Sequence, residues 1–358
     1  MNTIQMLFVL MLSIGLMNHV IIIPVLLEIA GRDAWISTVI GLILLVIFLP
    51  LIYFPIKQSQ QTRIFQWLKE NIGAPIAYFI ASITSLYLLV ISIVTLKDTT
   101  TFTTTSYLTA TPDWAIIVTL SMICFYNASI GLPSIAKTSG IILPFVVVFG
   151  IFVAFATTPH KNYDLLKPML EEGWGPVWKG VMYVAAGYGE IVLLLFMQQQ
   201  MKTNISFMKL ILFGLVAASL SIGPTIGAIT EFGPTEASHL RYPAFEQWRM
   251  VNLGTYLEHF DFLSVYQWLA GAFIRISLAT ALIPELFAIT NKASRRWILI
   301  FVYVVIFFAA MTPMSDYTFF HILKEWLLPI SFFFICFLSI VLFVLALAIR
   351  IKERRASA

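Results

Sequence analysis

Long runs of apolar residues recur from one end of this chain to the other and constrain its fold more than any other feature. Windows of roughly 20 apolar residues, enough to cross a bilayer as a helix, occur about ten times. Hydrophobic residues make up 59% of the 358 residues and charged residues 11%, too few polar groups to cover a water-soluble fold of this size. The sequence therefore predicts an all-α polytopic membrane protein. The predicted spans are residues 4–29, 34–56, 75–96, 114–130, 135–157, 177–198, 207–229, 260–287, 297–312 and 326–349.

Charged residues in the connections predict the orientation. An even number of spans puts both termini on one side, and the connections on that side hold most of the basic residues, including Arg63, Lys137 and the tail 350–358. Most acidic residues, among them Glu171 and Glu231, fall on the other side. The positive-inside rule then predicts cytoplasmic termini. The net charge of +4 follows from this pattern, so we expect contact with membrane lipid and no nucleic-acid partner.

Two further features concern processing and thiol chemistry. The first five residues carry no basic side chain and the apolar run that follows is long enough to span, so we expect the first helix to be retained. Cys124 and Cys336 both lie inside apolar runs, which predicts small buried side chains and neither a disulfide nor a metal pair.

Several connections are longer than turns. Residues 60–71 mix charged and large apolar side chains, which predicts a short helix on the cytoplasmic interface or, alternatively, a surface linker. Residues 157–179 and 230–258 are expected to be external caps over a site below. The threonine-rich run 99–111 is expected to continue the third span, with hydroxyls bonded back to the backbone, or to be plain loop packing.

Two spans are interrupted at matching places. The first contains Ser13-Ile14-Gly15-Leu16-Met17-Asn18-His19 and the sixth contains Gly187-Tyr188-Gly189-Glu190. A break in mid-membrane leaves backbone groups that hydrocarbon cannot satisfy, so it survives only where it lines a cavity or binds something. Interruptions in corresponding segments of two halves predict the ligand site of a transporter-type fold.

The first interruption predicts half of that site. Gly15 permits backbone angles that a helix forbids, while Asn18 and His19 supply donors and acceptors at membrane depth. Free N–H groups from about Met17 to His19 would suit the carboxylate of a small zwitterion, because the positive end of a helix dipole lies there. The alternative is a glycine packing contact with His19 bonded to a neighbouring helix.

Two charged residues inside spans extend the site. An ionised Glu190 side chain is energetically unfavourable at membrane depth, so we expect it to receive a ligand's amino group, hold a proton or pair with a cation. A purely structural ion pair is the alternative. The guanidinium of Arg275 in the eighth span is expected to reach Glu190 or the carbonyls of the first interruption. There its charge would do the work of the bound sodium ion in sodium-coupled transporters of similar architecture. The alternative for Arg275 is an extended side chain that reaches the cytoplasmic surface.

Polar side chains on other spans are candidates to complete the pocket. They are Tyr87 and Ser92 in the third span and Tyr266 and Ser277 in the eighth, with packing or interface anchoring as the alternative. Glu285 is expected to join Arg295 or Arg296, either as an inner gate or as an exposed interfacial ion pair.

Enzymatic signatures are missing from the sequence. We find no P-loop, no His/Cys cluster at ligand spacing, no nucleophile elbow and no dinucleotide fingerprint. The Gly-Tyr-Gly at 187–189 lacks the preceding residues of a potassium filter. The sequence therefore predicts no catalytic residue, no metal and no cofactor.

The chain resembles the spore germination permeases, the B subunits of GerA-type germinant receptors in the amino acid/polyamine/organocation superfamily. The resemblance is carried by Gly31-Arg32-Asp33-Ala34-Trp35-Ile36-Ser37, by Tyr242-Pro243 with Arg249, by Phe260-Asp261 with Trp268, Phe273, Arg275, Ile276 and Ser277, and by Gly187-Tyr188-Gly189-Glu190. It implies a LeuT-like fold of two inverted five-helix repeats, here about 4–157 and 177–349, with broken first and sixth helices. It also implies the inner membrane of a bacterial spore, an A subunit and a lipoprotein C subunit as partners, and a small nutrient as germinant.

Two functions fit the sequence. One is a sensor that binds a germinant, most simply an amino acid, between the first, third, sixth and eighth spans and passes a conformational change to its partners. The other is a secondary amino acid transporter, coupled to protons or to no ion.

Overall fold

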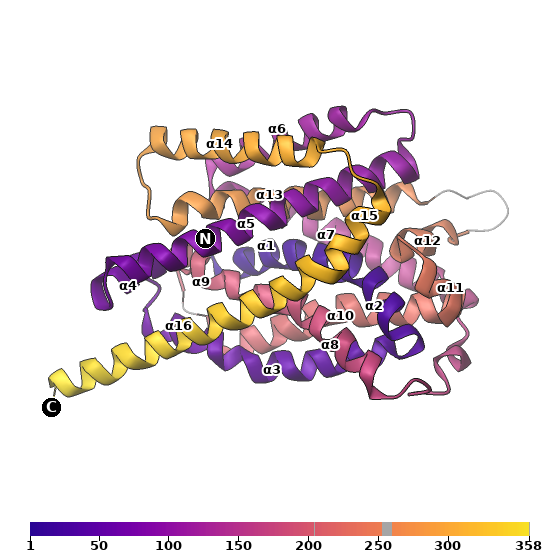
Figure 1. Ribbon diagram of the computed structural model, residues 1–358, viewed down its shortest axis with the longest axis horizontal. Helices are drawn as coiled ribbons and strands as arrows, with labels where there is room; N and C mark the ends of the chain where they lie inside the picture. The colour runs from indigo at the N-terminus through magenta and orange to yellow at the C-terminus, as the bar shows by residue number, and fades with distance from the viewer. Residues whose placement is uncertain (204, 253–259, 358) are drawn as a thin grey trace.

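The computed structural model describes residues 1–203, 205–252 and 260–357, and within these ranges it contains helices and no strand (Figure 1). The first half of the chain forms α1 (Thr3–Leu16), η1 (Met17–Ile21), α2 (Ile22–Ala30), η2 (Gly31–Asp33), α3 (Ala34–Gln58), α4 (Ile64–Asn71), α5 (Ala74–Phe102), η3 (Thr103–Tyr107), α6 (Asp113–Ile130), α7 (Leu132–Ala156), η4 (Thr158–His160) and η5 (Tyr163–Leu166). The second half forms α8 (Trp174–Tyr188), η6 (Gly189–Leu193), α9 (Leu194–Met197), η7 (Gln198–Gln200), α10 (Phe207–Phe232), α11 (Pro234–His239), α12 (Pro243–Arg249), α13 (Phe262–Leu286), α14 (Lys292–Met311), α15 (Asp316–Ile322), η8 (Leu323–Leu327) and α16 (Leu328–Ser357).

Nine helical stretches in the described part of the chain are long and apolar enough to cross a membrane, so the chain is a polytopic membrane protein. The first stretch, Thr3–Gln58, has 56 residues and contains two of the predicted spans. At 1.5 Å per residue it is about 80 Å long, more than twice the hydrocarbon thickness. Gly31, with φ of +50°, interrupts it between α2 and α3. The nine stretches therefore account for all ten predicted spans.

Burial separates central from peripheral spans. In the most apolar window of Trp174–Gln200, 89% of the residues are buried inside the protein, and in that of Phe262–Leu286 the share is 83%. The corresponding share in Leu132–His160 is 11%, so α7 faces outward over most of its surface. α13 packs against both α5 and α1 (Figure 1). The sixth and eighth spans thus form the centre of the bundle, where a polar residue is least accessible to water.

The two ends of the bundle differ in what they contain. At one end, here the terminal end, the Met1 ammonium donates to the Gln200 carbonyl oxygen at 2.7 Å, and Gln58 Nε2 donates to Glu353 Oε2 at 2.7 Å. The last turns of α16 extend beyond the bundle at this end (Figure 1). The opposite end, here the far end, carries α11, α12 and α15. The predicted orientation puts the terminal end in the cytoplasm.

The structure confirms a helix in each of two predicted connections. The predicted short helix within 60–71 is confirmed as α4, with Ile64, Trp67 and Leu68 buried against the bundle. Thr100 and Thr103 Oγ1 donate to the carbonyl oxygens of Leu96 and Thr99, which confirms the continued third helix and its back-bonded hydroxyls. The cap predicted over 230–258 contains α11 and α12, and its positions 253–258 lie outside the described residues. The inverted repeats 4–157 and 177–349 stay a prediction.

Candidate functional site

The first span passes through a π-helical turn, η1, and is not fully unwound. The Met17 N–H donates to the Ile14 carbonyl oxygen, three residues back, and the Ile22 N–H donates to the Met17 carbonyl oxygen, five residues back. The prediction of a free N–H at Met17 is therefore wrong: the helix changes its hydrogen-bonding pitch and does not open. The Ser13 carbonyl oxygen, which would accept from Met17 in a regular helix, instead accepts from Arg275.

The sixth span changes helix type at the predicted place. α8 ends at Tyr188, and the tighter 3₁₀ segment η6 begins at Gly189 and contains Glu190. Gly187 lies against the first span so closely that a Cβ there would come within 2.0 Å of Asn18 Oδ1 and 2.5 Å of Ile22 Cδ1. A side chain at position 187 would therefore have to displace the side chains of Asn18 and Ile22.

Glu190 and Arg275 form an ion pair at the centre of the bundle. Arg275 Nη2 donates to Glu190 Oε1 at 2.6 Å, and Arg275 Nη1 donates to Glu190 Oε2. The same Nη1 donates to the Ser13 carbonyl oxygen at 3.0 Å, and Nε donates to Thr95 Oγ1 at 3.1 Å. Tyr87 Oη donates to Glu190 Oε1 at 3.3 Å. We call Ser13, Tyr87, Thr95, Glu190 and Arg275 the central network.

The central network is closed to water. The side chains of Arg275 and Glu190 are 2% and 0% exposed, which excludes an arginine that reaches the membrane surface. A buried pair of this kind is tolerated when further hydrogen bonds satisfy the remaining polar atoms, as the Ser13 carbonyl, Thr95 and Tyr87 do here. The pair is formally neutral and joins α1, α5, η6 and α13.

The side chain of Asn18 lies beside the central network and is fully buried. In the described part of the chain, neither its Oδ1 nor its Nδ2 has a hydrogen-bond partner. Buried polar groups are almost always paired, so each exception requires an explanation. Asn18 is therefore a position in the predicted site where a donor and an acceptor are both unpaired among the described residues.

The remaining residues of the two interruptions contact neighbouring helices. His19 Nδ1 donates to the Leu220 carbonyl oxygen at 3.2 Å, and Tyr188 Oη donates to the Ala218 carbonyl oxygen at 3.3 Å, both on α10. Ser221 Oγ of the same helix donates to the Asn18 carbonyl oxygen at 3.2 Å. Gly15 faces Leu220 and Gly189 faces Ile335 of α16. The structure thus surrounds Asn18 with α10 on one side and the central network on the other, and Met17 Sδ accepts from Arg275 Nη2 at 3.6 Å.

Three candidate residues lie outside this cluster. Tyr266 packs against Phe149 of α7 with ring centroids 5.7 Å apart, and Ser277 Oγ donates to the Cys124 carbonyl oxygen at 3.5 Å. Tyr266 is nine residues and Ser277 two residues from Arg275, which at 100° per residue puts both near the opposite face of α13. Ser92 bonds back to the Leu88 carbonyl oxygen on its own helix.

Sequence reasoning missed other members of the site. Thr95 bonds Arg275, Ser221 bonds the Asn18 carbonyl, and Phe334 of α16 stacks on Tyr87 with centroids 4.6 Å apart. Hydroxyl and aromatic residues are frequent in every span of this chain, so none of the three stands out in the sequence.

At the terminal end, Glu285 forms the predicted pair with Arg295 and not with Arg296. Arg295 Nη1 donates to Glu285 Oε1, and Arg63 Nη2 lies 3.7 Å from Glu285 Oε2. The prediction of an exposed pair is wrong, because the Glu285 side chain is 8% exposed. The α4 connection folds back over it and brings Arg63 into contact.

Comparisons with known proteins all find spore germination proteins. A family model described as "Spore germination protein" matches residues 1–318. The chain is similar to spore germination protein XB of Bacillus anthracis, with 44% identity over 353 residues that cover 99% of each chain. It is also similar to two proteins of Bacillus subtilis (strain 168): spore germination protein A2, 23% identical over 319 residues (85% of this chain and 86% of A2), and spore germination protein KB, 22% identical over 288 residues (77% and 75%).

Proposed function

Because the chain belongs to the spore germination protein family, we propose that it is the germinant-sensing subunit of a receptor in the spore's inner membrane. In this proposal a small nutrient, such as an amino acid, binds where η1 meets η6. The change in conformation passes to an A subunit and a lipoprotein C subunit, the partners that the family resemblance implies. The termini are on the cytoplasmic side.

The unpartnered amide of Asn18 is the observation that carries this proposal. An unsatisfied buried polar group costs about 1–3 kcal/mol, so a ligand that bonds both Oδ1 and Nδ2 recovers that free energy in the bound state only. A ligand shifts a conformational equilibrium only through such differential stabilisation. A zwitterionic amino acid offers the matching groups, since its carboxylate accepts from Nδ2 and its ammonium donates to Oδ1.

The central network supplies the second part of the proposal. Arg275 brings a fixed positive charge to the Ser13 carbonyl and to Glu190, the contacts that a bound cation would otherwise satisfy. A protein with this built-in cation requires no sodium ion for ligand binding. The germinant dose response is therefore expected to be the same in sodium, potassium and choline salts.

The test uses spores in which Asn18→Leu replaces the wild-type copy. Leucine has a similar shape and no polar atoms, so the germinant response, measured as dipicolinic acid release, should be lost or moved to much higher nutrient concentration at normal protein level. Asn127→Leu is the matched control, because Asn127 is also buried but lies on α6, away from η1 and η6. Equal responses of wild type and Asn18→Leu would contradict the proposal.

A second assay separates the sensor from a secondary transporter. Membrane vesicles containing this chain alone are supplied with labelled amino acid under a proton gradient. A sensor binds its ligand without concentrating it, so accumulation that depends on the chain would favour transport.

A further inference from the structure

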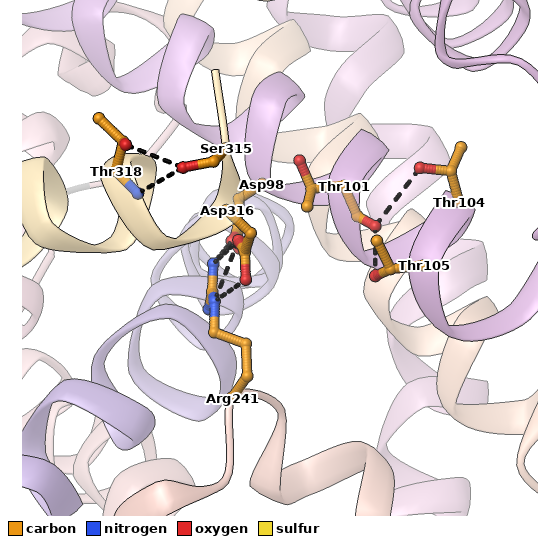
Figure 2. A network of polar contacts seen from close by, with 8 residues as sticks. All are labelled: Asp98, Thr101, Thr104, Thr105, Arg241, Ser315, Asp316 and Thr318. Carbon is orange, nitrogen blue, oxygen red and sulfur yellow. Dashed lines mark hydrogen bonds and ion pairs between the residues drawn. The ribbon is translucent and has the colours of Figure 1, made fainter. Parts of the chain in front are cut away.

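At the far end of the bundle, one arginine lies between two carboxylates (Figure 2). Arg241 lies in the turn between α11 and α12. Its Nη2 donates to Asp98 Oδ1 of α5 at 2.7 Å, and its Nε donates to Asp316 Oδ2 of α15 at 3.1 Å. The guanidinium also contacts the rings of Tyr242 and Phe320, 4.6 and 4.9 Å from their centroids. We call Asp98, Arg241 and Asp316 the far-end latch.

The charges of the latch do not balance. Two carboxylates face one guanidinium, so without Arg241 the two acids would repel each other. The Asp98 side chain is 2% exposed and that of Asp316 is 34% exposed, so one arm of the latch is buried and the other can be hydrated. Burial lowers the pKa of Arg241, but the carboxylates of Asp98 and Asp316 raise that pKa by more, and the guanidinium stays charged. The latch is a charge-dependent contact between α5, α15 and the α11–α12 turn.

Four aromatic side chains form a layer beneath the latch. Phe102 of α5 and Trp268 of α13 stack with centroids 3.7 Å apart and planes 6° apart. Tyr242 meets both edge-on at 5.1 and 5.3 Å, and Phe245 of α12 meets Phe102 at 5.3 Å. Burial and the Asp98 carboxylate raise the pKa of Tyr242, so its ring remains neutral. The α11–α12 segment thus contributes two of the four rings and the cation above them.

This aromatic layer lies directly over the central network. Phe102 is seven residues beyond Thr95 on α5, and Trp268 is seven residues before Arg275 on α13. Seven residues are nearly two whole turns, so each ring shares a helix face with the residue below it, about 10 Å nearer the far end. Thr95 and Arg275 are themselves hydrogen-bonded. A molecule entering between α5 and α13 from the far end would meet the latch and the aromatic layer before it met Thr95 and Arg275.

We propose that the far-end latch and its aromatic layer close the site from the far end, and that the α11–α12 turn swings away to admit the ligand. This proposal rests on the function proposed above, because it concerns access to the same site. α11 and α12 have six and seven residues, too short to persist as helices without their contacts to the bundle. The other end of α12 is fixed, since Trp248 is buried against Phe152 of α7, so the Arg241 end is the part free to move once its ion pairs break.

The alternative is that the latch only stabilises the fold and does not open. The two hypotheses predict different labelling rates for a reporter cysteine placed below the aromatic layer. Ile91 is suitable because it is buried on α5, four residues after Tyr87 and four before Thr95, on the face that meets the central network. Ile91→Cys is introduced into a chain in which Cys124 and Cys336 are replaced by serine and alanine.

The measurement is the rate at which a membrane-impermeant cationic methanethiosulfonate labels this cysteine in right-side-out and inverted vesicles. Thr109→Cys marks the far-end face, because Thr109 is exposed there. With Arg241 intact, Ile91→Cys should react slowly from both faces. Arg241→Gln should raise the rate about tenfold or more from the far-end face only, since charge-assisted hydrogen bonds are lost from the closed state alone.

Matched variants make the test specific. Arg249→Gln is the control, because Arg249 lies on the same short helix and, among the described residues, pairs with Glu246 at the surface. Asp316→Asn leaves the ion pair between Arg241 and Asp98 in place, so it should raise the labelling rate by a smaller factor. This variant tests the closure if Arg241→Gln does not fold. An unchanged labelling rate in folded Arg241→Gln and Asp316→Asn protein, or an equal rise in Arg249→Gln, would overturn the closure.

Labelling requires no germinant. If Asn18→Leu spores respond normally while Arg241→Gln exposes Ile91→Cys, the proposed function fails and the closure stands. If Asn18→Leu abolishes the response while labelling is unchanged, the closure fails and the proposed function stands.

Discussion

Arg275 and Arg241 are both arginines paired with carboxylates, but they are built in opposite ways. Arg275 has one carboxylate, full burial and three further hydrogen-bond partners on other helices. Arg241 has two carboxylates, one of which is a third exposed, and belongs to a turn between two short helices. The first pair is balanced and costly to break, while the second can be hydrated when it opens. The difference indicates a permanent joint at the centre and a releasable contact at the far end.

The largest loss of stability is expected from breaking the Glu190–Arg275 ion pair of the central network. Arg275→Gln leaves Glu190 charged and unpaired in the bundle core, which should cost about 3–5 kcal/mol of folding stability. Thermal unfolding of the solubilised protein measures it. The double variant Arg275→Gln with Glu190→Gln removes both charges and should be more stable than either single variant. A double variant no more stable than the singles would show that the pair is not coupled.

Crowding the centre should have the next largest effect. Gly187→Ala places a Cβ against Asn18 and Ile22, and overpacking of this kind costs about 1–3 kcal/mol. Gly140→Ala on α7 is the matched control, because its added Cβ meets no packing neighbour within 4 Å in the part of the chain that the structure describes. Equal stability of the two variants in the same unfolding assay would mean that η1 and α8 are not in close contact.

The far-end latch should contribute less to stability than the centre. Arg241→Gln should lower stability by about 1–2 kcal/mol, since water can replace part of the contact to Asp316. Added salt should reduce the difference between this variant and the wild type, because the outer arm of the latch is exposed to screening ions. A loss of stability in Arg241→Gln that is as large as that in Arg275→Gln and does not depend on salt would contradict the distinction between the central network and the far-end latch.

The smallest loss of stability is expected at Asn18. Asn18→Leu removes two buried polar atoms that make no hydrogen bond with the described residues, so the ligand-free protein should lose no stability and should gain up to about 1–3 kcal/mol. Glu190→Gln, one helix away, should be clearly destabilising in the same assay. A strongly destabilised Asn18→Leu protein would show that the amide is satisfied in the folded state.

Charged residues made the centre predictable from sequence. Glu190 and Arg275 stand out because ionised side chains are rare inside apolar spans and must find partners there. Glycines in the first and sixth spans indicated where these helices change type, although the first span changes its hydrogen-bond pattern and does not open. The pattern thus predicted the ion pair and the two changes of helix type but overstated how far the first helix is broken.

Residues that depend on helix phase were harder to predict. Tyr266 and Ser277 share a helix with Arg275, but the 100° step per residue turns them away from it. The far-end latch was missed because Asp98, Arg241 and Asp316 come from three distant segments, and each alone resembles an ordinary charge near a membrane surface. Only the packing of α5, α15 and the α11–α12 turn brings them together.

Ligand-induced stabilisation of the purified protein tests the central claim most directly. A ligand at 100 times its Kd stabilises a protein by about 2.7 kcal/mol, a shift that a thermal unfolding assay resolves. Across a panel of amino acids, sugars and nucleosides, at least one compound should raise the Tm of the wild type and of Asn127→Leu while leaving Asn18→Leu unchanged. A compound that stabilises Asn18→Leu as strongly as the wild type would contradict the claim that this amide binds the germinant.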